Sequence, residues 1–139
     1  FQYLETLQPE PALLPSDPFE AAKVMELVCH IKLDIELVAR RCLPELLFKK
    51  PVSDETKKEV KRDLNKGIKA VERLLVCDPY IAGDTITIAD FYAFYCLGLA
   101  SQLANIAEVD LLGEQPALKS LMEKLAAHPS IAQVTAEQA

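Results

Sequence analysis

The side chains that could act as nucleophiles, acid-base groups or metal ligands in this chain are few and widely spaced. They are four cysteines and two histidines: Cys29, Cys42, Cys77, Cys96, His30 and His128. No two cysteines form a Cys-x-x-Cys pair, and two histidines are too few for the common zinc patterns. The pattern predicts no metal site and no disulfide framework, and it favours reduced thiols that pack as small apolar residues.

His30 lies in an apolar stretch, where an imidazole is more often packed or capped than catalytic. We find no Cys, Asp or Glu at the spacing of a nucleophile and its base, so we expect a packed side chain. Tyr92 and Tyr95 lie in an uncharged run, and we expect core packing with each hydroxyl bonded to a neighbour. We therefore expect structural roles for these three side chains.

Thr87 and Asp90 stand three residues apart at the start of an apolar run, in the stretch GDTITIAD. Thr87 is expected to be the N-cap of a helix: its hydroxyl accepts from the N–H of Asp90, and the Asp90 carboxylate accepts from the N–H of Thr87. Ile86 and Phe91 occupy the positions of a hydrophobic staple. The box is worth about 1 kcal/mol, and its predicted role is to fix the start of the next helix.

The helix that follows this box is the centre of the predicted fold. Residues 91–107 include no charged side chain. A helix that is apolar nearly all round is buried by its neighbours, and its strongly apolar part, of about ten residues, is too short to span a membrane. We expect a buried central helix.

Another long helix, the first in the chain, is predicted from Pro18 to about Cys42. Ser16 or Asp17 caps it, and Pro44 ends or kinks it. Within it, HIKLDIELV alternates as a strand would, but the flanks are strong helix formers, and a typical strand is far shorter than the whole run. Such a helix carries apolar and charged residues on several faces. It should therefore touch more than one neighbour, or border a cleft or a partner subunit.

The rest of the chain also predicts helices. Ser53 caps an amphipathic helix, Pro116 starts a short one, and Ser130 caps the last. The apolar stripe of the first of these is Val60, Leu64, Ile68, Val71 and Leu75. The fold class is therefore all-α: one domain over residues 16–139, with about five helices around the buried central helix. Residues 1–15 read as the end of an earlier helix followed by a proline linker.

The charge of the chain excludes two classes of partner. With a formal net charge of −6 and a pI near 4.9, the chain lacks the field of lysines and arginines that nucleic acids and anionic membranes require. The basic segment KKEVKRDLNKGIK is diluted by Glu59 and Asp63 and is expected to be a solvated helix face. Reduced thiols favour a cytoplasmic protein.

Four stretches resemble the C-terminal half of cytosolic glutathione transferases of the bacterial type. They are YLE, LLPSDP, YIAGDTITIAD and LKSLMEKLAAHPSI. Together with the long helix between the second and third stretches, they give a match that spans nearly the whole chain, with the family's order and spacing of elements. YIAGDTITIAD is the most specific, since it resembles the family signature whose Thr and Asp form a capping box.

The resemblance implies that the catalytic groups lie elsewhere. In the family, an N-terminal thioredoxin-like domain binds glutathione, the co-substrate, and activates its thiol. Residues 1–15 would retain only the end of that domain's last helix and the linker, and since the chain starts at Phe1 without a Met, we expect a piece of a longer protein. The resemblance implies no catalytic residue and no cofactor in this chain, which should be inactive alone.

The helical domain of the family supplies the pocket for a hydrophobic electrophile and part of a homodimer interface. Carried over to this sequence, the pocket would include Glu36, Ala39, Arg40 and Leu43. Glu36 and Arg40, four residues apart, could instead form only a surface ion pair. The implied partners are the N-terminal domain, a second copy and the electrophile.

Two other functions stay open at this point. Helical domains of this fold also occur as non-catalytic interaction modules, because fold alone does not determine function. The chain could also be a fragment without an activity of its own. An intact thiol-activating residue in the preceding sequence would favour the enzyme.

Overall fold

The computed structural model describes residues 1–113 and 115–138, and this part of the chain is helical with no strand. The helical segments are α1 (Gln2–Leu7), α2 (Pro18–His30), η1 (Ile31–Glu36), α3 (Leu37–Ala39), η2 (Arg40–Cys42), α4 (Leu43–Phe48), α5 (Asp54–Glu72), α6 (Ile88–Tyr92), η3 (Ala93–Leu97), α7 (Gly98–Ile106), α8 (Pro116–Ala126) and α9 (Pro129–Gln138). Segments α2 to α4 follow one another directly, as do α6 to α7. The described residues beyond the linker therefore form five helices, which confirms the all-α prediction.

The first long helix in the chain, formed by segments α2 to α4, begins as predicted. The Asp17 carboxylate accepts from the N–H groups of Phe19 at 2.9 Å and Glu20 at 3.0 Å. Pro44 was expected to end or kink the helix, and the structure agrees: α3 stops at Ala39, a 3-10 turn follows over Arg40–Cys42, and α4 begins at Leu43 with Pro44 in its first turn. Segment α4 ends at Lys49, whose φ of 51° is left-handed.

The alternating stretch of the first helix is a π-helical segment, η1, so the choice of helix over strand is correct. Ile31 and Ile35 are buried in the core, whereas Leu33 and Leu37 are 56% and 57% exposed. The apolar residues of the alternation therefore divide between two faces of one helix. The helix contacts both α5 and the central helix, which agrees with the prediction that it touches more than one neighbour.

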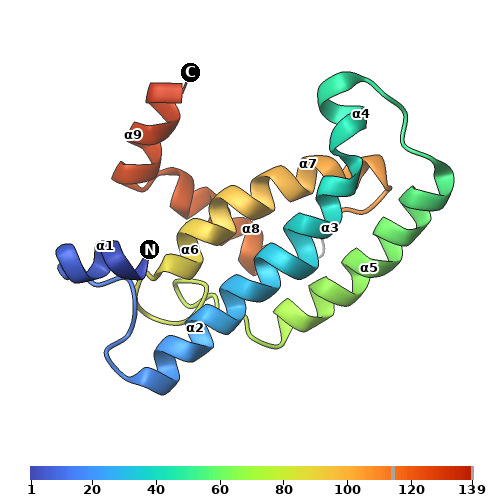
Figure 1. Ribbon diagram of the computed structural model, residues 1–139. Helices are drawn as coiled ribbons and strands as arrows, with labels where there is room; N and C mark the ends of the chain where they lie inside the picture. Colours follow the sequence, from blue (N-terminus) through green and yellow to red (C-terminus); the bar gives the residue numbers. More distant parts are fainter. Residues whose placement is uncertain (114, 139) are drawn as a thin grey trace.

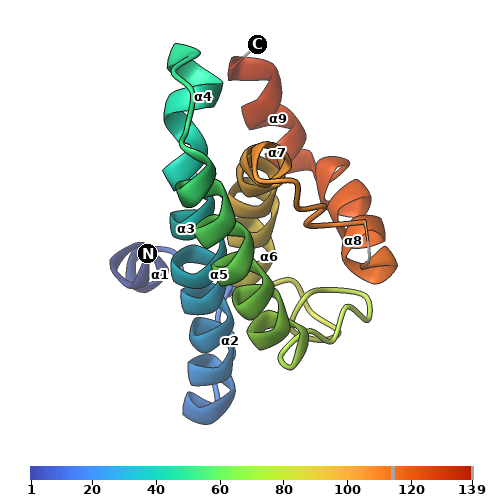
Figure 2. The ribbon, with the colours of Figure 1, turned by 90° about the vertical axis from the view of Figure 1, so that its right-hand side faces the viewer.

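The α6–α7 helix lies at the centre of the bundle, as predicted. Figure 2 shows it between the α2–α3 helix with α5 on one side and α8 on the other. Six of its apolar side chains have no exposed surface: Ala89, Ala93, Leu97, Ala100, Leu103 and Ala104. Several are alanines, and small side chains allow neighbouring helices to approach closely.

The α5 helix lies beside the first long helix at short range (Figure 1). A Cβ added to Gly67 would lie 2.3 Å from the carbonyl oxygen of Asp34. Only a glycine fits at this crossing, which explains a residue that otherwise weakens a helix.

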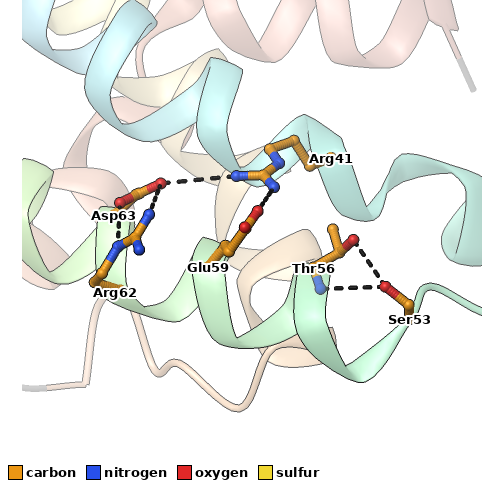
Figure 3. A network of polar contacts seen from close by, with 6 residues as sticks. All are labelled: Arg41, Ser53, Thr56, Glu59, Arg62 and Asp63. Atoms are coloured by element: carbon orange, nitrogen blue, oxygen red, sulfur yellow. Dashed lines mark hydrogen bonds and ion pairs between the residues drawn. The ribbon is translucent and has the colours of Figure 1, made fainter.

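Polar contacts join η2 of the first long helix to the first half of α5 (Figure 3). Arg41 forms an ion pair with Glu59 and lies 3.7 Å from Asp63. Ser53 caps α5, as predicted, by accepting from the N–H of Thr56 at 3.2 Å. These exposed pairs are each worth less than about 1 kcal/mol, so they align the helices while the apolar core provides the stability.

No helix of the described residues is long and apolar enough to cross a membrane. The same part of the chain holds no group of three or more potential metal-ligating side chains.

Candidate functional site

The start of the central helix is fixed by the carboxylate of Asp90, which is fully buried. Its Oδ2 accepts from the N–H of Thr87 at 2.8 Å and from the Thr87 hydroxyl at 3.2 Å. The Thr87 side chain also lies at the N–H of Asp90, so both halves of a capping box are present. The N–H of Asp90 is bonded to the Thr87 carbonyl oxygen at 3.1 Å, and the carboxylate is therefore the stronger half.

The expected staple residues, Ile86 and Phe91, are half-buried, and both pack against the core. The Phe91 ring meets the ring of His128 edge-on, with 5.7 Å between the ring centres. The staple contact between Ile86 and Phe91 stays a prediction.

An apolar pocket opens on the first half of the central helix. It has a volume of about 280 Å³ and is lined by Ile88, Phe91, Tyr92, Tyr95 and Cys96. Tyr95 is 44% exposed, and Tyr92 is half-buried. The prediction that both tyrosines pack in the core is therefore wrong for Tyr95, whose ring forms an open wall of the pocket.

Charged side chains of the first long helix border this pocket, because η1 packs against η3. The Lys32 Nζ lies 5.2 Å from the centre of the Tyr92 ring, a cation–π contact. Glu36 is buried beside Cys96, and its Oε1 lies 2.6 Å from Nη2 and 2.8 Å from Nε of Arg40. Lys32 and Glu36 therefore contact residues that line the apolar pocket, and Arg40 is paired with Glu36.

The Cys96 thiol is not a nucleophile at neutral pH. Burial, followed by the charge of Glu36, raises its pKa to about 11. Because a thiolate is the reactive form, a thiol that keeps its proton at pH 7 is inert. Cys96 therefore contributes an apolar wall to the pocket.

The four residues that the resemblance assigns to the pocket take different positions. Glu36 and Arg40 form the ion pair that was one of the two alternatives, and the Arg40 side chain remains 50% exposed. Ala39 has no exposed surface and belongs to the core, and Leu43 is partly buried against the core. The role of these four residues in binding a substrate stays a prediction.

Sequence reasoning missed two features of this region. The first is the side of the central helix that carries Phe91, Tyr92 and Tyr95, whose spacing of three and four is a signal for a shared aromatic face. The second is a partner for His30, whose Nδ1 lies 2.6 Å from Oδ2 of Asp34, four residues along the helix. The expectation that His30 has no acidic partner is wrong.

Comparisons of the sequence with known proteins point to one family. The family model of the glutathione S-transferase C-terminal domain matches residues 42–138. A glutathione S-transferase of Pseudomonas putida is 36% identical over 137 residues, which cover 98% of this chain and 62% of that protein. A probable maleylacetoacetate isomerase of Vibrio cholerae is 29% identical, with 98% of this chain and 63% of that protein covered.

Solved structures share the fold. A glutathione transferase homologue from Sulfitobacter with bound glutathione has a TM-score of 0.76 at 20% identity, covering 99% of this chain and 72% of that one. A glutathione S-transferase of Methylobacterium radiotolerans in complex with glutathione sulfonate has a TM-score of 0.74 at 26% identity, covering 95% and 61%. The chain spans about three fifths of the length of the curated relatives it matches. It belongs to the glutathione S-transferase family, as the family's C-terminal helical domain.

Proposed function

We propose that this domain forms the electrophile-binding side of the active site in a protein that conjugates glutathione to hydrophobic electrophiles. Glutathione would be held by an N-terminal thioredoxin-like domain of the same protein. The observation that carries the proposal is the open apolar pocket of Ile88, Phe91, Tyr92, Tyr95 and Cys96 on the central helix. Apolar walls with a few polar groups at the border are typical of small-molecule sites.

The raised thiol pKa values in this domain support the proposal that the nucleophile comes from outside the domain. Burial is the largest cause that raises the pKa of Cys42, Cys77 and Cys96. These three thiols are protonated at neutral pH, so none of them can attack an electrophile in its reactive form. A glutathione thiolate would supply that nucleophile, and two of the solved relatives hold glutathione or its sulfonate.

The linker contacts support a preceding domain that borders the pocket. The N–H of Ile88, which lines the pocket, donates to the carbonyl oxygen of Leu13 at 2.9 Å. The Glu5 carboxylate accepts from the N–H groups of Leu13 at 2.7 Å and Leu14 at 3.2 Å. These bonds tie α1 and the linker to the first turn of α6, so a domain joined to α1 would lie at this end of the central helix.

We further propose that the parent protein is a cytoplasmic homodimer. Free cysteines without disulfides, among the residues described, are consistent with a reducing compartment. Leu33 and Leu37 form an exposed apolar pair on the first long helix, and a second copy would cover this pair.

The enzymatic proposal is tested with the protein that contains this domain and its preceding domain. We expect turnover of glutathione with an aryl halide or an organic peroxide, and retention on immobilised glutathione. The 139-residue chain alone should show neither. A two-domain protein that turns over none of these electrophiles and is not retained would contradict the proposal and favour a non-catalytic interaction module.

A further inference from the structure

The carboxylate of Glu5 holds the linker that follows α1. Its Oε1 accepts from the backbone N–H groups of Leu13 at 2.7 Å and Leu14 at 3.2 Å, eight and nine residues along the chain. A bond from a backbone N–H to a carboxylate is charge-assisted, and it is stronger than a bond between neutral groups. Because one oxygen receives two consecutive backbone donors, Glu5 fixes the direction of the chain at these two residues.

The side chain of Glu5 faces the linker, while its neighbours on α1 face outward. Glu5 is half-buried, whereas Tyr3, Leu4 and Leu7 are exposed. Among residues 1–113 and 115–138, no Lys, Arg or His nitrogen lies within 4.0 Å of the Glu5 carboxylate. Its contacts in this part of the chain are therefore with the linker backbone and not with a cation.

The linker in turn contacts the central helix beside the apolar pocket. The N–H of Ile88 donates to the carbonyl oxygen of Leu13 at 2.9 Å. Ile88 is the first residue of α6, where an N–H has no acceptor within the helix, and its side chain lines the pocket. Since Glu5 holds the N–H of Leu13 and Ile88 binds its carbonyl oxygen, Glu5 connects α1 to the pocket.

The linker has no regular structure that could set its own path. Residues 8–17 lie between α1 and α2 and form neither helix nor strand. The rate of a reaction between two bound groups depends steeply on their mutual orientation, and a displacement of about 1 Å can cost about a hundredfold. Contacts that hold the linker would therefore matter for any reaction between a group on the preceding domain and a group in the pocket.

We propose that Glu5 is a positioning residue. Through its bonds to Leu13 and Leu14 and the bond from Ile88 to Leu13, which together we call the linker clasp, it aligns the glutathione-binding domain with the electrophile pocket. Glu5 contacts neither reactant and acts through the linker backbone. This inference rests on the proposed function, which places the two reactants on the two domains, and adds the side chain that sets their alignment.

The clasp is tested in the 139-residue chain by hydrogen–deuterium exchange at single amides. Glu5→Ala should speed the exchange of Leu13, Leu14 and Ile88 about tenfold or more, because two amides lose their acceptor and the third loses a fixed carbonyl. Glu10→Ala removes an exposed carboxylate from the same linker and should change none of these rates. Equal rates in Glu5→Ala and the unaltered chain, or unprotected amides in the unaltered chain, would overturn the clasp.

The catalytic role is tested in the two-domain protein with glutathione and an aryl halide. Glu5→Ala should lower kcat about tenfold to thirtyfold, because the thiolate and the electrophile lose their alignment. Glu5→Gln keeps an acceptor oxygen of the same reach without the charge, so its loss should be smaller, about threefold. Isothermal titration calorimetry should show unchanged affinity and stoichiometry for glutathione in both variants, and Glu10→Ala should change none of these values.

The stoichiometry separates positioning from a general loss of folding. A partly unfolded variant would lose glutathione sites in proportion to kcat, whereas misaligned reactants lower kcat at full binding. An unchanged kcat in Glu5→Ala, or a fall of kcat matched by lost sites, would overturn this inference and leave the proposed function intact. An unaltered two-domain protein without turnover would overturn the proposed function and the catalytic role of Glu5, while the exchange rates would still decide the clasp.

Discussion

The carboxylate of Asp90 accepts a hydrogen bond from the backbone N–H of Ile81, nine residues earlier, at 2.8 Å. Both residues are fully buried. Because the other oxygen of the same carboxylate accepts from Thr87, one side chain joins the preceding loop to the first turn of the central helix. The capping box is therefore a tertiary contact as well as a helix cap.

Asp90→Ala should lower the free energy of unfolding by about 2–3 kcal/mol, more than a simple cap substitution. The variant leaves the buried N–H groups of Ile81 and Thr87 without their acceptor. Urea denaturation followed by circular dichroism measures the change. Asp84→Ala, at an exposed position of the same loop, should change stability by less than about 0.5 kcal/mol. Equal effects of the two substitutions would contradict the role of Asp90.

Two glycines in helices should respond to alanine with opposite signs. Gly67→Ala places a Cβ 2.3 Å from the Asp34 carbonyl oxygen, so we expect destabilisation by about 2–3 kcal/mol despite the better helix propensity. Gly98→Ala meets no atom within 4 Å and should stabilise the protein by up to about 1 kcal/mol. Thermal unfolding of both variants tests the close contact between α5 and η1. A Gly67→Ala variant as stable as Gly98→Ala would show that the contact is looser.

The Cys96 thiol predicts a loss of stability at high pH. Burial and Glu36 raise its pKa from 9.0 to about 11, so the folded state holds a proton that the unfolded state releases above pH 9.0. Since the folded state binds more protons in this range, the free energy of unfolding falls as the pH rises from 9.0 to about 11. Unfolding experiments over this range should show a smaller fall in Cys96→Ala. An equal fall in both proteins would mean that Cys96 does not contribute.

The exposed apolar pair of the first long helix predicts the oligomeric state of the parent protein. Leu33→Glu would place a charge in the proposed interface, so the two-domain protein should change from a dimer to a monomer in light scattering coupled to gel filtration. Leu47→Glu, at another exposed leucine near the end of α4, should leave the dimer intact. A dimer that tolerates Leu33→Glu would exclude this face.

Much of the fold follows from local sequence signals. Three helices have N-caps at Asp17, Ser53 and Thr87. Each cap depends on residues within one turn, so these helix starts could be predicted. The bond from Ile81 to Asp90 could not, because it depends on the path of the intervening loop. Pro44 was a further local signal, because the first long helix is interrupted by the 3-10 turn Arg40–Cys42 just before it.

The candidate site was less accessible to sequence analysis than the fold. An uncharged helix predicts burial, but which side stays open depends on the neighbours that pack around it, so the exposure of Tyr95 was missed. The partners of Glu36 show the same limit. Its ion pair with Arg40 is local and was considered, whereas its position beside Cys96 arises from the packing of η1 on η3.

The most direct test of the proposed pocket is the steady-state kinetics of the two-domain protein with Tyr95→Ala. The proposal predicts that KM for an aryl halide rises about tenfold while KM for glutathione stays unchanged, because only the wall for the electrophile is removed. Phe48→Ala, which removes an exposed aromatic ring from the far end of the first long helix, should change neither value. An unchanged KM for the electrophile in Tyr95→Ala, or a rise only in KM for glutathione, would contradict the proposal.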